Sequence, residues 1–226
     1  DIEKLFAWHR KTQLQDYVQL LKLAQKQVQR NVSTAEILTD YDEVKQRASL
    51  IIDKALPDLA DLALTLRPQQ IARIEKKFAA NNDDYRKDYL RGDIEQHQRL
   101  RFRKVMEQAE YWFGDFSREQ EALIRRASDA RPLDNALWLA DRMHRQREMI
   151  AVLKKIQAEK PSRDATMLLL KDYAVLVFER TGMAEHAQFF NASKEGMASM
   201  AALIINSTTP AQKAHAIRKL QQWIDN

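Results

Sequence analysis

Two short segments combine arginines with a large apolar side chain, and they are the part of the sequence best suited to bind another molecule. Arginine, methionine and aromatic residues are enriched at protein interfaces. A guanidinium can stack on an aromatic ring and can also pair with a carboxylate. We therefore predict a surface for protein partners. Its residues are Arg99, Phe102, Arg103, Arg142, Met143 and Arg145.

The same arginines could instead form ion pairs within their own helices. Glu107 follows Arg103 by four residues, and Asp141 precedes Arg145 by four. Pairs at this spacing stabilise a helix by only about 0.2–0.5 kcal/mol. Because acids and apolar residues interrupt both basic segments, we expect no nucleic-acid partner.

Asp141, His144 and Glu148 could share one face of a helix. Three arginines surround them, which favours a solvated charged face over a catalytic or metal site.

Other patterns with chemical meaning are missing from the sequence. It has no cysteine, which excludes thiol catalysis and cysteine-type zinc sites. None of the 5 histidines lies four residues from another, and no H-E-x-x-H motif occurs. The chain has 4 glycines, without a phosphate loop, a dinucleotide fingerprint or a G-x-S-x-G elbow. The sequence therefore predicts no catalytic residue, no metal and no cofactor.

The elements that carry these residues are predicted to be helices. Glycine and proline are scarce, and the chain is rich in good helix formers. We expect an all-α fold, an elongated bundle of about eight or nine antiparallel helices joined by short loops. A single domain over residues 1–226 is expected, with a possible internal boundary near 160–163. The net charge is +5, and no apolar run approaches the ~20 residues needed to span a membrane.

Apolar periodicity and capping residues set the expected helix bounds. The predicted helices cover 2–29, 34–55 or beyond, 68–91, 94–113, 118–130, 134–158, 163–180, a stretch ending near 205, and 210 to the end. Residues 182–196 are expected to be looser. The helix over 163–180 is apolar nearly all round, which places it in the centre of the core. The residues expected to be buried are Trp8, Leu21, Ile52, Ile71, Phe78, Leu169, Tyr173, Leu176 and Trp223.

Three predicted helix starts share one pattern, in which a glutamine lies at the third helical position. These glutamines are Gln70, Gln120 and Gln212. A glutamine at this position can accept a hydrogen bond from the backbone N–H of the capping residue. Ser33 and Glu36 form a similar pair at the start of the second helix. The pattern predicts well-defined helix starts.

A series of short motifs, taken in order, resembles an uncharacterised family of helical proteobacterial lipoproteins. The motifs are Phe6 to Arg10, Leu66 to Ile71, Phe113 to Gln120, Trp138 to Ala140 with Arg145 to Arg147, and Asn206 to Gln212. The resemblance implies a precursor whose lipidated cysteine lies upstream of Asp1, a periplasmic location and association with the outer membrane through that lipid. The family has no assigned catalytic residues.

The capped glutamine pattern is also similar to the L-T-x-x-Q signature of Spy-like periplasmic chaperones, although Arg67 replaces its threonine. We therefore expect a non-enzymatic envelope lipoprotein that binds protein partners or unfolded clients. An enzyme or enzyme accessory acting on the cell wall or outer-membrane lipid is the alternative, and a structural spacer is a third possibility.

Overall fold

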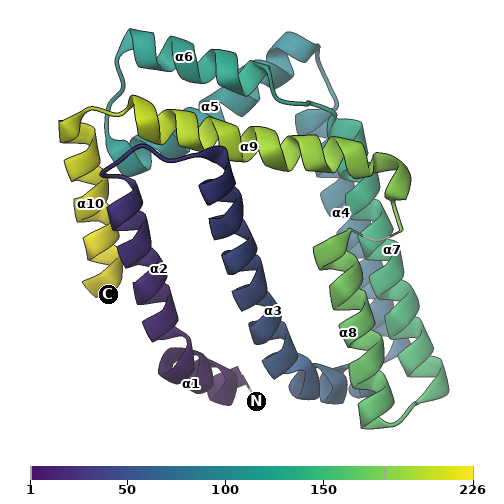
Figure 1. The fold of residues 1–226 in the computed structure, drawn as a ribbon. Helices are drawn as coiled ribbons and strands as arrows, with labels where there is room; N and C mark the ends of the chain where they lie inside the picture. Colours follow the sequence, from purple (N-terminus) through teal and green to yellow (C-terminus); the bar gives the residue numbers. More distant parts are fainter. Residues whose placement is uncertain (1, 181, 226) are drawn as a thin grey trace. The chain divides into compact units, whose positions relative to one another are not determined.

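The computed structural model describes residues 2–180 and 182–225, apart from the side chains of Ile2, Lys4 and Leu5 (Figure 1). This part of the chain contains ten α-helices, one 3-10 helix and no strand, which confirms the predicted all-α fold class. The elements are α1 (Ile2–Thr12), α2 (Leu14–Gln27), α3 (Thr34–Thr65), α4 (Pro68–Tyr89), α5 (Ile94–Phe113), α6 (Arg118–Asp129), α7 (Asn135–Glu159), α8 (Arg163–Glu179), η1 (Ala184–His186), α9 (Ala187–Ser207) and α10 (Pro210–Asp225).

The helices form two compact units, each assembled from segments that are distant in the sequence. The first unit contains residues 44–92 and 134–188, and the second contains 2–43, 93–133 and 189–226. Helix α3 passes from the second unit into the first. None of these divisions falls at 160–163, and the single-domain expectation stays a prediction.

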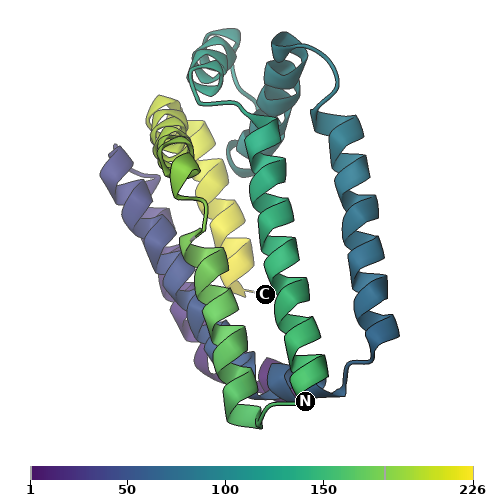
Figure 2. The same cartoon turned by 90° about the vertical axis from the view of Figure 1, so that its right-hand side faces the viewer.

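In the first unit, α4 packs against α7 and α7 packs against α8 (Figure 2). Its core consists of five buried residues, Ala63, Ile71, Ile150, Leu153 and Ile156. Three ion pairs also join α8 to α3 in antiparallel register, with a spacing of eight residues on each helix. They are Glu179–Lys45 at 2.7 Å, Lys171–Asp53 at 3.2 Å and Arg163–Asp61 at 2.7 Å.

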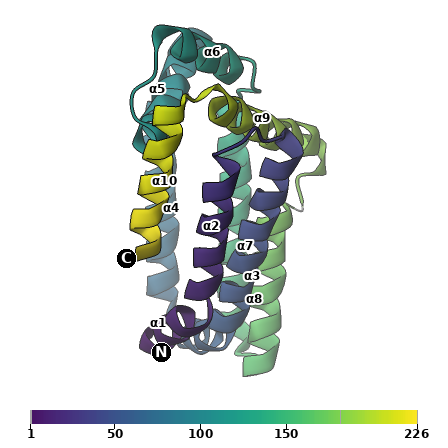
Figure 3. The ribbon, with the colours of Figure 1, turned by 60° about the vertical axis from the view of Figure 1, so that its left-hand side comes forward.

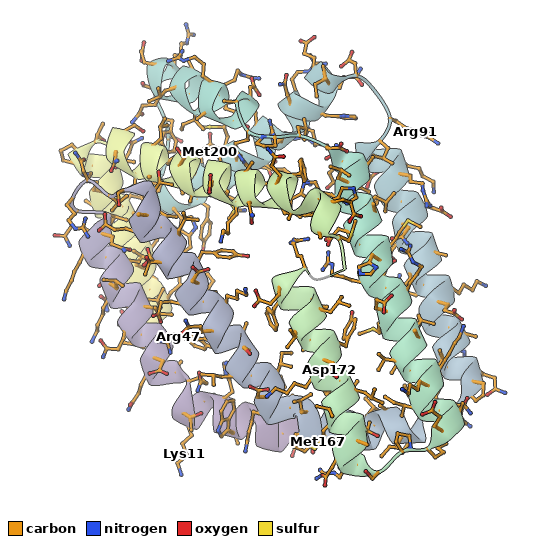
Figure 4. All side chains as sticks on the ribbon, turned by 45° about the vertical axis from the view of Figure 1, so that its right-hand side comes forward. Lys11, Arg47, Arg91, Met167, Asp172 and Met200 are labelled. Carbon is orange, nitrogen blue, oxygen red and sulfur yellow. The ribbon has the colours of Figure 1, made fainter. Side chains whose placement is uncertain are left out.

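In the second unit, α10 packs against α2 and α5, α6 packs against α5, and α1 packs against α2 (Figure 3). Helix α9 contributes Met200, labelled in Figure 4, and Ile204 to the core. The buried residues of this core are Val28, Met106, Ala109, Phe113, Ile124, Met200, Ile204, Ala216 and Leu220.

The helix starts follow the predicted capping chemistry. The side-chain oxygens of Gln70, Gln120 and Gln212 accept hydrogen bonds from the backbone N–H three residues earlier, at 3.0, 2.9 and 2.8 Å. Ser33 and Glu36 form the expected reciprocal pair at the start of α3. Each of these contacts satisfies N–H groups that a helix start otherwise leaves without a partner.

Two predicted segments differ from the structure. The first helix is broken at Gln13, where the Thr12 hydroxyl donates to the Trp8 carbonyl at 2.8 Å. Hydroxyl bonds of this type bend helices. The expected loose region is also wrong beyond His186, because α9 begins at Ala187. Burial of Phe190 gives this helix tertiary contacts that the local pattern does not reveal.

The predicted core is correct for Ile71 and wrong for Trp223, which is 55% exposed. Its indole N–H donates to the Tyr111 hydroxyl at 3.0 Å, which keeps the ring at the surface. The other predicted core residues are only partly buried. They are Trp8, Leu21, Ile52, Phe78, Leu169, Tyr173 and Leu176.

The central position expected for the helix over 163–180 is also wrong. In α8 only Thr166 is fully buried, and Leu168 is 61% exposed. Within the first unit, α7 and α3 lie on two sides of α8 and leave a third side uncovered. That side carries Leu168 and Val175 together with Asp172, which Figure 4 labels.

Candidate functional site

A groove of about 510 Å³ lies between α4 and α7 in the first unit. On each helix, the six lining residues follow one another at intervals of three, one, three, one and three residues. From α4 these are Glu75, Phe78, Ala79, Asn82, Asp83 and Arg86. From α7 they are Met143, Gln146, Arg147, Ile150, Ala151 and Lys154. This spacing selects one face of each helix, so two facing stripes form the walls of what we call the α4–α7 groove.

The charged residues of the α4–α7 groove lie mostly in pairs. Lys154 and Glu75 form an ion pair at 2.8 Å, and Arg86 and Asp83 form another at 2.7 Å. Arg86 also donates to the sulfur of Met143 at 3.5 Å. The remaining side chains of the lining are apolar, apart from two amides and one further arginine.

The two amides, Asn82 and Gln146, line the groove and contact each other where α4 packs against α7. The Asn82 side-chain N–H donates to Gln146 Oε1 at 2.7 Å. Asn82 is only 6% exposed, and its Oδ1 has no hydrogen-bond partner. An unsatisfied buried acceptor costs about 1–3 kcal/mol. The groove therefore contains a polar atom that packing alone does not explain.

Arg147 is the third polar feature of the α4–α7 groove. It is exposed, and within the described residues no carboxylate lies at ion-pair distance from it. Since the other charges of the groove are paired, Arg147 gives the groove an excess positive charge.

The other side of α7 carries a buried ion cluster, which corrects the expectation of a solvated charged face. The Asp141 side chain is 1% exposed and accepts hydrogen bonds from Arg145, at 2.7 Å, and from Arg180. The Arg180 guanidinium lies 5.0 Å from the centre of the Trp138 ring. Because Arg180 follows α8 directly, the cluster attaches the end of α8 to α7.

The neighbouring His144 packs against Gly182. A Cβ atom at residue 182 would lie 2.7 Å from His144 Nε2, and its φ of +87° is a conformation that favours glycine. His144 Nδ1 is 4.0 Å from the Glu148 carboxylate. These contacts hold the segment after α8 against α7, so we interpret the cluster as structural.

The six predicted partner-binding residues are divided between the two units. Arg99, Phe102 and Arg103 lie on α5 in the second unit. Arg99 pairs with Glu95 at 2.5 Å, and Arg103 with Glu107 at 3.9 Å. Phe102 lies under the guanidinium of Arg125, 4.0 Å from the ring centre. Two of the three residues therefore form pairs within their own helix.

Arg142, Met143 and Arg145 lie on α7, and only Met143 lines the α4–α7 groove. Arg145 pairs with Asp141, as the alternative interpretation of the sequence expected. The Arg142 guanidinium lies 5.8 Å from the centre of the Tyr85 ring. The Tyr85 side chain is partly buried, and this burial raises its pKa. A partner-binding role for the six residues stays a prediction.

Asn82, Gln146 and Arg147 were not predicted from the sequence. Asn82 belongs to the run Asn81-Asn82-Asp83-Asp84, which has no calcium-loop pattern. The available signal was helical spacing, because Phe78, Asn82 and Arg86 are four residues apart and share one face. The facing residues on α7, Gln146 and Arg147, could not be identified without knowing that α4 packs against α7.

The described part of the chain offers neither a metal site nor a membrane span. No cluster of three or more histidine, aspartate or glutamate side chains there could hold a metal ion. None of the described helices combines the length and the apolar character needed to cross a membrane.

The run from Asn206 to Gln212, which contributes to the family resemblance, ties together three parts of the second unit. Asn206 donates to the Val32 carbonyl at 2.9 Å and accepts from the Val32 N–H at 2.8 Å. The Gln212 side-chain amide donates to the Asp115 carbonyl at 2.6 Å and to Gln120 Oε1 at 3.2 Å, and Gln120 donates back to Gln212 at 2.9 Å. The run therefore acts as a structural clasp.

Comparison with known proteins agrees in part with the resemblance. Neither the curated proteins nor the solved structures contain a significant match. Residues 1–177 match a family of unknown function, DUF6279. The match covers all of the α4–α7 groove and ends before the clasp that begins at Asn206. Because it extends over most of the 226 residues, the chain belongs to the family of unknown function DUF6279.

Proposed function

We propose that this protein is the body of a non-enzymatic, lipid-anchored protein of the bacterial envelope, which binds protein partners or unfolded clients through the α4–α7 groove. The envelope location and the lipid anchor rest on the resemblance to proteobacterial lipoproteins. The binding role rests on the groove itself.

The observation that carries the proposal is an open groove with an apolar lining and few unpaired polar atoms. Binding sites are typically concave, mostly apolar, and supplied with a small number of placed polar groups. The groove joins Phe78, Ile150 and Met143 with the unpaired oxygen of Asn82. A polypeptide is complementary to these features, because its apolar side chains can contact the apolar lining while its backbone N–H groups can donate to Asn82 Oδ1.

Site-specific crosslinking in intact cells tests the binding role. A photoreactive phenylalanine analogue would replace Ala79, which lines the groove, or Ala80, which is exposed on the same helix outside the groove. We expect defined crosslinked proteins from position 79 and few from position 80, identified by mass spectrometry. Equal capture from both positions, or none from position 79, would contradict the proposal.

Two further experiments test the remaining parts. The full-length precursor should incorporate an azide-labelled palmitate in cells, and a precursor that stays unlabelled would remove the lipid anchor. Suppression of aggregation of a reduced, unfolding client would support the chaperone form. No suppression at several-fold molar excess would leave a scaffold for specific partners.

A further inference from the structure

We propose that the α4–α7 groove binds an extended polypeptide segment in which an apolar side chain lies beside a carboxylate. This inference rests on the proposed function, because it assumes that the ligand is a polypeptide. It adds the chemistry that the ligand must present, and that chemistry follows from the amide pair, the unpaired arginine and the size of the groove.

The amide pair leaves one acceptor and one donor unpaired, and a ligand reaches the buried acceptor, Asn82 Oδ1, when the Asn82 side chain turns into the groove. Asn82 donates to Gln146, which leaves Asn82 Oδ1 without a donor and the Gln146 side-chain NH2 without an acceptor among the described residues. Rotating both amides by 180° exchanges their roles but preserves one free acceptor and one free donor. A peptide unit offers the complementary N–H and C=O groups.

The chain itself contains an amide that binds a peptide backbone in this way. In the second unit, the side chain of Asn206 accepts from the N–H and donates to the C=O of Val32, at 2.8 and 2.9 Å. An Asn side chain can therefore satisfy both backbone groups of a residue that lies outside a helix. In the α4–α7 groove, Asn82 and Gln146 divide the same two bonds between them.

The charges of the groove indicate that the ligand carries a carboxylate. The pairs Glu75–Lys154 and Asp83–Arg86 are neutral, whereas Arg147 has no acidic partner within the described residues. Arg147 follows Gln146 in the sequence, and both line the groove. A ligand whose backbone meets the amide pair would thus place a neighbouring acidic side chain near the guanidinium.

The size of the groove favours a short extended segment. Small-ligand sites usually have volumes of about 300–1,000 Å³, and this groove, at about 510 Å³, falls within that range. Phe78, Ile150 and Ala151 supply apolar walls that one large aliphatic or aromatic side chain can contact. An α-helix is about 10 Å wide with its own backbone groups already paired, so it would leave the amide pair unsatisfied.

A binding experiment with the purified chain tests this inference. The probe is a fluorescein-labelled octapeptide of glycine and serine that contains one leucine–aspartate step, measured by fluorescence anisotropy. Matched peptides replace the aspartate by asparagine, replace the leucine by serine, or methylate the backbone nitrogen of the aspartate. We expect each replacement to weaken binding, because each removes one of the three recognised groups.

Protein variants assign each group to its residue. Arg147→Gln should weaken binding of the aspartate peptide by about two- to fivefold, the effect of an exposed ion pair, and leave the asparagine peptide unchanged. Asn82→Leu should weaken binding by about threefold to tenfold. Ala151→Trp, which fills the groove, should abolish it. Lys155→Gln changes an exposed cation of α7 outside the groove and serves as the control.

Several outcomes would overturn the inference. One is equal binding of all four peptides, and another is an effect of Lys155→Gln equal to that of Arg147→Gln. Binding of decanoate that depends on Arg147, without peptide binding, would assign the groove to a small amphiphile. If crosslinking at position 79 captures proteins but the four peptides bind with equal affinity, the proposed function stands and this ligand chemistry fails. Circular dichroism of each variant checks that it is folded.

Discussion

Removing the carboxylate of Asp141 should destabilise the first unit strongly. The side chain is buried at 1% exposure and accepts hydrogen bonds from Arg145 and Arg180. Asp141→Ala removes the carboxylate that both guanidiniums contact and leaves a cavity in its place. It also removes one of the links between α7 and Arg180, the residue that follows α8.

The expected cost follows from the burial of each member of the cluster. Removing one partner of a fully buried ion pair costs about 3–5 kcal/mol. Arg145 and Arg180 are partly exposed and can turn toward water, which reduces the cost. We therefore expect Asp141→Ala to lower the free energy of unfolding by about 2–4 kcal/mol. At about 1.5 kcal/mol per molar of urea, the unfolding midpoint falls by roughly 1.3–2.7 M.

Trp138 provides a local reporter for the measurement. The sequence has 4 tryptophans, and Trp138 is the one that lies in the first unit. Its ring is 5.0 Å from the Arg180 guanidinium, so its fluorescence senses the cluster directly. Replacing the other three, Trp8, Trp112 and Trp223, by phenylalanine gives a background in which urea unfolding of the first unit is followed alone.

A matched rescue variant separates charge from volume. The triple variant Asp141→Leu, Arg145→Met and Arg180→Met removes the whole cluster and should recover most of the lost stability, because apolar side chains of similar size can replace a buried ion group. An Asp141→Ala midpoint within error of the parent would show that the ion cluster does not stabilise the first unit. A triple variant that is less stable than the single one would contradict the expected rescue.

Three further predictions concern the helix starts and metal dependence. Gln212→Ala should lower the free energy of unfolding of the second unit by about 1–3 kcal/mol, because the Asp115 carbonyl loses the Gln212 donor and Gln120 loses one of its partners; an unchanged urea midpoint would contradict the clasp. The hydrogen bond from Arg30, together with those from Ser33, lowers the pKa of Glu36 to about 2. The ionised Glu36 carboxylate therefore stabilises the fold above its unfolded pKa of about 4.3, and this stabilisation is lost as the pH falls toward 2. Glu36→Gln should flatten the dependence of the melting temperature on pH in that window, and parallel profiles would contradict it. Addition of a chelator should leave the melting temperature unchanged, and a marked decrease would reveal a structural metal.

The local chemistry of the helices could be predicted from the sequence alone. Capping pairs such as Ser117 with Gln120 involve residues three apart, and the scarcity of glycine and proline applies to the whole chain. These interactions form wherever the helix lies in the fold. They explain why the all-α class and most helix starts were predicted correctly, although the break at Gln13, where the Thr12 hydroxyl donates to the Trp8 carbonyl, was not predicted.

Which side chains are buried, and which contact each other, depends on how the helices pack together. Asp141 lies in a segment rich in arginine and was expected to be solvated, yet Arg180 reaches it from the end of another helix. Asn82 and Gln146 are 64 residues apart and become neighbours because α4 and α7 pack together. Periodicity identifies a face of a helix but not the helix that covers it. Burial and contacts between distant residues depend on that pairing, which arises from packing of the whole unit.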